Sequence, residues 1–498
     1  MVLTVAGAVL RLWGLGRQGL WYDEWLTADA TGGGLRDLVR HVAHVEGIGP
    51  TYFVAMWGWA QVFGDSEVSL RFVSVAFGVA TIPVAYAAAR ALGQSRVTGL
   101  VAATIVAVHP LLVWYSQEAR PYSLLAFCGA LSLLAYARAR DSGSVRDHLL
   151  WGGLAAVTVS IHYFAIFLFV VEGAALLAAA ARANRRTLLV GCTPLAAALV
   201  ALAPLAASQR ANAGSSWIAE FAYSARLSDI GTSALVGPST PEPWLWQPLA
   251  LVVVASVCLL ALAATTSARR AAALAAGLGV GALLLAIVAT LVGPDVLVGR
   301  YVIASLVPIV VAVAIGLTPG FSRPAQLVGG LGVVVFAAVS VFVVATVDTD
   351  SGLQKPDWQS VADVVGSPAG GERETRVVVM NLHGHQGLPL RYYLGGADEL
   401  AAGDSTEVRE IDVLVARATS RPCNFLVGRA CALVFLGAPL PRPLADRFTL
   451  TERVEIDQFV IERYRAPRPV AVTRQAILGA DGEQGLVLAV DVGPGPGT

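Results

Sequence analysis

The chain has 498 residues, of which 56% are hydrophobic and only 14% are charged, and its mean hydropathy is +0.65. Soluble domains carry about 25% charged residues, so an ordinary soluble enzyme is excluded. The 35 basic and 35 acidic residues balance, which leaves no basic excess for nucleic acid. Residues 347–498 hold half of the charged side chains in less than a third of the length, which predicts a water-facing domain there.

Apolar runs dominate the rest of the chain, and a helix needs roughly 20 apolar residues to cross a bilayer. Runs that approach this length lie at 2–15, 70–89, 97–109, 122–137, 148–161, 163–181, 187–207, 248–265, 271–292, 301–317 and 325–347. We therefore expect an α-helical polytopic membrane protein with about 11 transmembrane helices, formed by residues 1–347. The first run lacks the flanks of a cleavable signal peptide.

The positions of the arginines predict the orientation of these helices. Five alternate loops, around residues 90–96, 138–147, 182–186, 269–270 and 323, hold eleven Arg and two acids. Cytoplasmic loops are rich in basic residues, so we assign these five to the cytoplasm. An odd number of spans then places the C-terminal part outside the plasma membrane.

Two long outer loops follow from this orientation. The first, residues 16–69, contains an uncharged aromatic stretch at 52–63 that is too short to cross and predicts a helix lying in the interface. The second, residues 208–247, includes Trp217.

The C-terminal part, residues 348–490, reads as a small α/β domain. It has short β-like runs at 376–380, 411–415 and 432–436, and a helix that Asp357 caps. Residues 491–498 are expected to be disordered. Cys423 and Cys431 form a disulfide if the domain is extracytoplasmic, or are two buried thiols.

Acids and arginines near the predicted outer face are the candidates for chemistry. Asp23 and Glu24 follow the first span and are flanked by Trp21, Tyr22 and Trp25. Partial desolvation suits a carboxylate there to act as a general base, whereas the alternative is a pair of solvated loop acids beside an aromatic belt.

Arg120 and Arg300 each stand at the outer start of a span, where a helix N-terminus adds to the charge that attracts a phosphate. Alternatively, Arg120 pairs with Glu118 or reaches lipid headgroups. His162 lies in a tight outer turn, where a hydrogen-bonded structural residue is the commoner role.

The sequence has no zinc-type cluster and no phosphate-binding glycine loop. Acids near the site can hold a divalent cation, but nothing requires one, so we assign no metal and no firm cofactor.

Several of these elements together resemble the family 39 glycosyltransferases, which are GT-C membrane enzymes similar to protein O-mannosyltransferases and lipid A aminoarabinose transferases. The elements are Trp-Tyr-Asp-Glu at 21–24, Trp-Tyr-Ser-Gln-Glu-Ala-Arg-Pro-Tyr at 114–122, His-Tyr-Phe at 162–164, Arg-Tyr at 300–301 and Lys-Pro-Asp-Trp at 355–358. The resemblance covers roughly residues 1–360. It implies a polyprenyl-phosphate sugar as donor and transfer with inversion at the outer face.

The resemblance also implies roles for individual residues. Asp23 matches the catalytic acid with Glu24 beside it, and the donor-phosphate contacts are Arg120, Tyr122, Arg300 and Tyr301. Relatives often have His-Pro-Pro-Leu-Tyr-Tyr where this chain has Ile-Gly-Pro-Thr-Tyr-Phe at 48–53. Glu46 is therefore a candidate second acid, and Glu118, His162 and Trp217 are candidates for an acceptor or secondary site.

These observations predict an inverting transferase that moves a mannose-like or pentose sugar to an extracytoplasmic hydroxyl of a glycan, lipid or protein. Two alternatives from other classes stay open. One is a flippase or transporter for a lipid-linked sugar, which needs polar residues distributed through the spans. The other is a non-catalytic scaffold.

Overall fold

The computed structural model describes residues 1–179, 184–211, 218–219, 221–318, 320, 322–367, 374–380, 387–395, 397–401, 403–416, 440–456, 459–478 and 485–492. The chain divides into two compact units. A helical unit contains Met1–Leu15 and Thr27–Thr349, and a second unit contains Gly16–Leu26 and Asp350–Thr498. Trp217, Cys423, Cys431 and the predicted strand at 432–436 lie outside the described residues.

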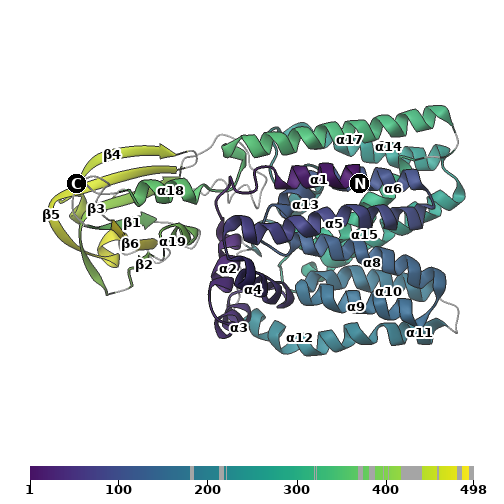
Figure 1. Cartoon of the computed structure of the whole chain (residues 1–498), viewed down its shortest axis with the longest axis horizontal. Helices are drawn as coiled ribbons and strands as arrows, with labels where there is room; N and C mark the ends of the chain where they lie inside the picture. Colours follow the sequence, from purple (N-terminus) through teal and green to yellow (C-terminus); the bar gives the residue numbers. More distant parts are fainter. Residues whose placement is uncertain are drawn as a thin grey trace. The chain divides into compact units, whose positions relative to one another are not determined.

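The helical unit is built from long apolar helices and short connecting ones (Figure 1). Its elements are α1 (Val2–Leu12), α3 (Leu35–His44), α4 (Thr51–Phe63), α5 (Glu67–Gly93), α6 (Arg96–Val108), α7 (Pro110–Ser116), α8 (Tyr122–Ser142), α9 (Val145–Ile161), η1 (Tyr163–Ala165), α10 (Ile166–Ala179), α11 (Asn184–Gly191), α12 (Thr193–Ala211), α13 (Tyr223–Val236), η3 (Pro243–Leu245), α14 (Trp246–Ala263), α15 (Thr266–Val292), η4 (Gly299–Ser305), α16 (Leu306–Gly316) and α17 (Arg323–Thr349). Helix α2 (Tyr22–Gly32) has residues in both units.

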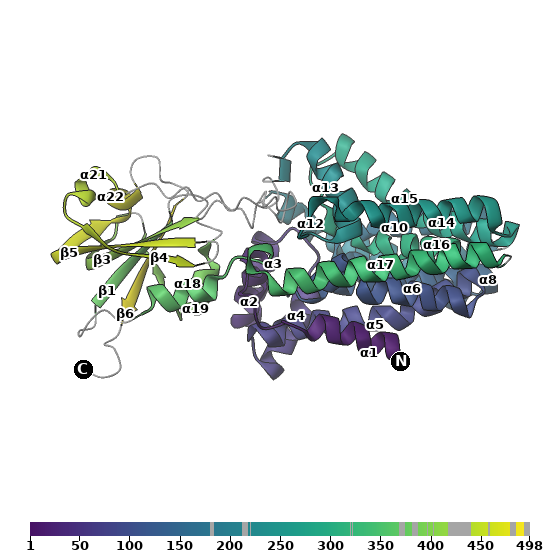
Figure 2. The same ribbon diagram turned by 90° about the horizontal axis from the view of Figure 1, so that it is seen from above.

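The predicted polytopic helical fold is confirmed, whereas the count of eleven spans is not. Seven helical segments of the described residues are long and apolar enough to cross a membrane, or eight if the bent pair α6 and α7 is one span. Three predicted spans correspond to α1, α9 and α10, which have 11, 17 and 14 residues. These are shorter than the roughly 20 residues that a perpendicular crossing needs. Longer helices such as α14 and α17 pack side by side (Figure 2).

The break between α6 and α7 shows how the sequence shapes the unit. Pro110 has no N–H for the carbonyl four residues earlier, so the helix bends by 56° at His109. The buried Arg11 of α1 donates instead to the carbonyls of Val106 at 3.0 Å and Ala107 at 2.8 Å. Its Nε also donates to Ser116 Oγ at 3.0 Å. Arg11 thereby fixes α7 and the loop that carries Arg120.

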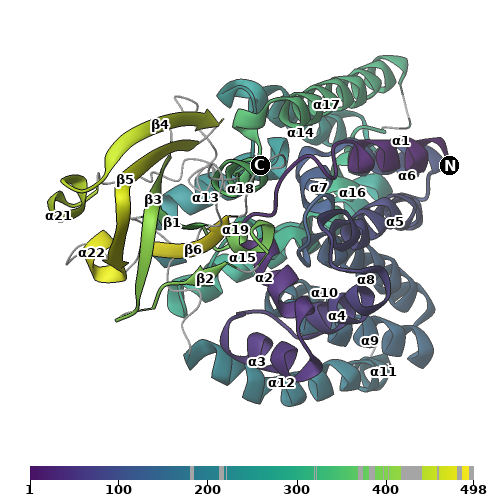
Figure 3. The ribbon, with the colours of Figure 1, turned by 60° about the vertical axis from the view of Figure 1, so that its left-hand side comes forward.

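The described residues of the second unit form a six-stranded sheet with short helices (Figure 3). Its elements are η5 (Ser351–Leu353), α18 (Trp358–Val365), β1 (Glu374–Met380), α19 (Pro389–Tyr393), β2 (Asp398–Glu399), β3 (Ser405–Ala416), α21 (Arg442–Ala445), β4 (Thr449–Ile456), β5 (Phe459–Thr473), α22 (Arg474–Leu478) and β6 (Leu486–Val492). The strand order is β2-β6-β1-β3-β5-β4, and β1 and β3 are parallel while the other pairs are antiparallel. Asp357 caps α18 as predicted, and β6 extends through Asp491 and Val492, which the sequence placed in the disordered tail.

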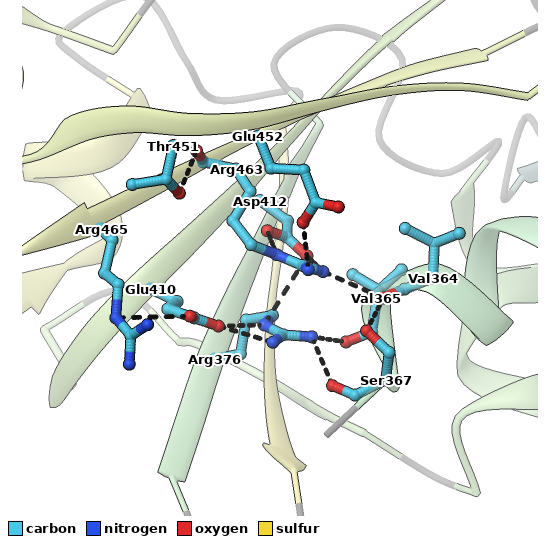
Figure 4. A network of polar contacts seen from close by, with 10 residues as sticks. All are labelled: Val364, Val365, Ser367, Arg376, Glu410, Asp412, Thr451, Glu452, Arg463 and Arg465. Carbon is cyan, nitrogen blue, oxygen red and sulfur yellow. Dashed lines mark hydrogen bonds and ion pairs between the residues drawn. The ribbon is translucent and has the colours of Figure 1, made fainter. Parts of the chain in front are cut away.

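A buried charge network joins α18 to this sheet (Figure 4). Arg376 of β1 donates to Glu410 of β3 and to the backbone carbonyls of Val365 and Ser367. Arg463 of β5 holds Asp412 with two hydrogen bonds of 2.9 Å and also reaches the carbonyl of Val364. The last turn of a helix leaves carbonyls without partners, so these two arginines fix the C-terminal end of α18.

Candidate functional site

The first element of the candidate site is a buried ion pair in the helical unit. Arg120, between α7 and α8, donates from its two terminal nitrogens to the two carboxylate oxygens of Glu46 at 3.0 and 3.1 Å. Both side chains are buried, and the guanidinium also lies over the ring of Phe53 at 5.6 Å. Such a two-pronged pair is the strongest form of ion pairing available to an arginine.

His41 of α3 extends this pair toward solvent. Its Nε2 lies 3.7 Å from Glu46 and its Nδ1 lies 3.4 Å from Asp29, whose side chain is about half exposed. Burial acts to raise the pKa of Glu46, but Arg120 and His41 outweigh it and lower the pKa to about 2. Burial likewise acts to lower the pKa of His41, but its bonds with Asp29 and Glu46 outweigh burial and raise the pKa.

The loop that carries Glu46 is held against the ends of other helices. Gln209 of α12 donates to the carbonyls of Val42 and Ile48 at 2.7 and 2.9 Å. A Cβ at Gly49 would lie 2.0 Å from the carbonyl oxygen of Ser160, so only glycine allows this close approach. The glycine in the Ile-Gly-Pro sequence, which departs from the relatives' pattern, is therefore explained by the close packing of this loop against the end of α9.

The second element gathers around Tyr122, the first residue of α8. Arg300, in the 3-10 helix η4, lies 5.7 Å from the centroid of the Tyr122 ring and 5.9 Å from that of Tyr301. The ring of His162 faces the same two rings, at 4.6 Å from Tyr301 and 6.4 Å from Tyr122. Cations over aromatic faces are stabilised electrostatically, and this arrangement keeps Arg300 buried.

His162 is a neutral imidazole in this cluster. The backbone N–H of Phe164 donates to His162 Nδ1 at 3.3 Å, so the ring proton belongs on Nε2. Burial lowers the pKa of His162 to about 3, and the nearby guanidinium groups of Arg120 and Arg300 act in the same direction.

Asp229 of α13 is a further acid near Arg300. It accepts a hydrogen bond from Ser233 at 3.3 Å. Burial raises the pKa of Asp229 to about 6 against the opposing effects of Ser233 and Arg300. A partly desolvated acid beside a guanidinium can accept a proton near neutral pH.

Asp23 and Glu24 lie in the first turn of α2, within the segment that belongs to the second unit. Glu24 is fully buried and accepts from the ammonium of Lys355 at 3.2 Å. The Lys355 ammonium also lies 5.9 Å from the centroid of the Trp21 ring. Asp23 is partly exposed. The adjacent acids therefore have different surroundings, because Glu24 is buried against a cation while Asp23 is partly exposed.

The structure brings together most of the residues that the sequence singles out in the helical unit: Glu46, Arg120, Tyr122, His162, Arg300 and Tyr301. Glu118 is buried two residues before Arg120. Sequence reasoning missed His41 and Asp229, and it named Lys355 only as part of the Lys-Pro-Asp-Trp element, without a role in the site. Lys355 carried a signal, because it is the only lysine among 35 basic residues. Among the described residues no three His, Cys, Asp or Glu side chains are placed to hold a metal ion.

Comparisons with known proteins agree with this arrangement. Residues 48–208 match a family model described as dolichyl-phosphate-mannose-protein mannosyltransferase. The structure of ArnT from Cupriavidus metallidurans in the apo state is similar, with 13% identity, a TM-score of 0.58 and coverage of 93% of this chain and 97% of that chain. ArnT from the same organism bound to undecaprenyl phosphate has 11% identity, a TM-score of 0.55 and the same coverage. No curated protein gave a significant sequence match.

The two ArnT structures share the arrangement of this chain over nearly their whole length, so the likeness establishes the fold. The family model falls on the part of the helical unit that contains Arg120 and His162. The chain thus matches the family model over part of its helical unit and shares its fold with the two ArnT structures.

Proposed function

We propose that this chain is an inverting glycosyltransferase that moves a sugar from a polyprenyl-phosphate donor to an acceptor hydroxyl. The observation that carries the proposal is that Arg300 lies over the ring of Tyr122, two residues after Arg120, and that His162 faces the same ring, in a chain with the fold of the ArnT structures. Two buried guanidinium groups from distant parts of the sequence form a site for an anion. The phosphate group of a polyprenyl-phosphate donor in the membrane is an anion that suits such a site.

The phosphate is the leaving group of the reaction. As the bond between the anomeric carbon and the phosphate oxygen breaks, negative charge grows on the phosphate. Arg120 and Arg300 neutralise that charge inside a buried site, where electrostatic stabilisation of a transition state is strongest. Tyr122 and Tyr301 hold Arg300 and complete the phosphate contacts.

Asp23 is the proposed general base. It takes the proton of the acceptor hydroxyl while the hydroxyl oxygen bonds to the anomeric carbon on the face opposite the leaving phosphate. A single displacement inverts the anomeric configuration and releases polyprenyl phosphate. Asp23 is the better candidate of the two acids because it is partly exposed, whereas Glu24 is buried against Lys355.

The remaining features of the proposal concern place and substrates. The C-terminal unit lies outside the plasma membrane, because the arginine-rich loops belong in the cytoplasm. The transferred sugar is mannose-like or a pentose. The acceptor is an extracytoplasmic glycan, lipid or protein.

A panel of polyprenyl-phosphate sugars, including mannose and pentose donors, tests the proposal with the purified full-length chain. We expect release of polyprenyl phosphate from at least one donor when an acceptor extract is present. Asp23→Asn should abolish this release but keep donor binding. A flippase would move the donor across the membrane of a vesicle, and Asp23→Asn would not affect that movement. A non-catalytic scaffold would release no polyprenyl phosphate.

A further inference from the structure

The imidazole of His162 carries a buried hydrogen-bond donor that the protein itself does not use. Its Nδ1 accepts from the backbone of Phe164, so Nε2 carries the proton. Nε2 has no hydrogen-bond partner in the part of the chain that the structure describes, and the side chain is only 1% exposed. An unsatisfied buried donor is costly and calls for an explanation such as a missing ligand.

The surroundings of this donor select the kind of ligand. The ring of His162 faces the same tyrosine rings as Arg300, and one of these, Tyr122, lies two residues after Arg120. A third N–H beside two guanidinium groups suits an oxyanion, which can accept from all three. A cation or an apolar ligand would be repelled or would leave Nε2 unsatisfied.

One anion already occupies part of this site. The carboxylate of Glu46 bonds to both terminal nitrogens of Arg120 with the geometry that a phosphate would use. His41, at 3.7 Å from Glu46, is a second cationic partner to which this carboxylate can turn when protonated. If another anion replaces Glu46 on Arg120, the Glu46 carboxylate can therefore pair with His41 and does not remain buried without a partner.

We propose that His162 Nε2–H, Arg120 and Arg300 together bind the donor phosphate, and that Glu46 occupies Arg120 until the phosphate displaces it. This inference rests on the proposed function, and it adds His162 as a neutral binding residue and Glu46 as an internal competitor. The two residues thus have opposite effects on the affinity for a polyprenyl phosphate.

Binding of undecaprenyl phosphate to the full-length chain in detergent micelles tests both assignments. His162→Phe keeps an aromatic ring among Tyr122, Phe164 and Tyr301 but removes the donor, so the Kd should rise about tenfold. Glu46→Gln weakens the internal competitor, so the Kd should fall about tenfold. Glu46→Asp keeps the charge but shortens the reach, and should lower the Kd by a smaller factor.

Matched controls separate these effects from damage to the fold. His148, at the other end of α9, bonds through Nδ1 to the carbonyl of Ser144 at 2.8 Å, so His148→Phe should lower the Tm and leave the Kd unchanged. His162→Phe removes an unsatisfied donor but also the acceptor of the Phe164 N–H, so its Tm without ligand should stay close to that of the wild type. Glu172, a buried acid bonded to Trp151 and Ser132, provides Glu172→Gln as the control for Glu46→Gln.

An unchanged Kd in His162→Phe, or a loss of Tm like that of His148→Phe, would show that His162 is structural. A Kd in Glu46→Gln that is unchanged or higher would show that Glu46 does not compete with the phosphate. If the wild-type chain itself fails to bind undecaprenyl phosphate, the proposed function fails together with this inference. If the wild type binds undecaprenyl phosphate and the Kd is unchanged in both His162→Phe and Glu46→Gln, only this inference is overturned and the proposed function stands.

Discussion

The pairing of Glu24 with Lys355 leads to a prediction that can be worked from the structure. The ammonium and the carboxylate are 3.2 Å apart and both side chains are buried. At an effective dielectric constant of about 20, two unit charges at this distance attract by about 5 kcal/mol. Removal of one member of a buried pair typically costs about 3–5 kcal/mol, because the other charge stays buried.

The perturbation is a double-mutant cycle of Glu24→Gln, Lys355→Met and the double variant. Each single substitution should destabilise the second unit by about 3–5 kcal/mol. A unit of this size loses about 2–4 °C of Tm per kcal/mol, so each Tm should fall by about 6–20 °C. The double variant removes both charges and should recover much of that loss, since the coupling between paired groups reaches about 3 kcal/mol.

Thermal unfolding of the purified full-length chain, followed by tryptophan fluorescence, measures the cycle. Trp21 and Trp358 lie in the second unit and report on it. If the double variant loses as much stability as the two single variants added together, Glu24 and Lys355 are not coupled. The claim that Glu24 is held in an ion pair with Lys355, unlike Asp23, would then be wrong.

Three further predictions follow from the site and the topology. Arg300→Ala should impair use of the donor in steady-state transfer assays, and Arg300→Lys should restore part of it, because lysine keeps the charge but not the planar fork; wild-type turnover in Arg300→Ala would exclude a phosphate contact. The pKa of His41 is raised from its usual 6.5, so its stabilising charge is present below about pH 6.5 and is lost as the pH rises through the raised pKa. The Tm advantage of the wild type over His41→Asn should therefore shrink as the pH rises above about 6.5, and a constant difference would argue against this ion pair. A reporter enzyme fused after Ser351 should be active only outside the cytoplasm, and cytoplasmic activity would reverse the assigned orientation.

The sequence predicts local features of this chain well, because they depend on short-range rules. Pro110 ends one helix and begins the next, Asp357 caps α18, and the predicted strands at 376–380 and 411–415 lie within β1 and β3. Strand β5 (Phe459–Thr473) was not predicted, since Pro467, Pro469 and several charges interrupt its pattern. Helices α1 and α10 are shorter than the apolar runs at 2–15 and 163–181, whereas α9 begins before the run at 148–161.

The partners of the site residues depend on long-range contacts, which a single sequence does not contain. Arg120 and Glu46 are 74 residues apart, and Lys355 and Glu24 are 331 residues apart. The resemblance to relatives picks out Arg300 and His162 individually, but only the fold shows that both lie against the rings of Tyr122 and Tyr301. Residues 48–53 differ from the relatives' pattern, and only the structure shows that Gly49 allows a close approach to the carbonyl oxygen of Ser160.

The most direct test of the account is the role of Asp23 in transfer. With a polyprenyl-phosphate sugar that the wild-type chain uses, Asp23→Asn should lower the rate of polyprenyl phosphate release about 10²–10⁴-fold, as loss of a general base does. The affinity for the donor should survive, Glu24→Gln should cost less, and the wild-type product should have inverted anomeric configuration. A retained configuration, or near-normal turnover by Asp23→Asn, would contradict the proposed mechanism and make Glu24 or Glu46 the next candidate.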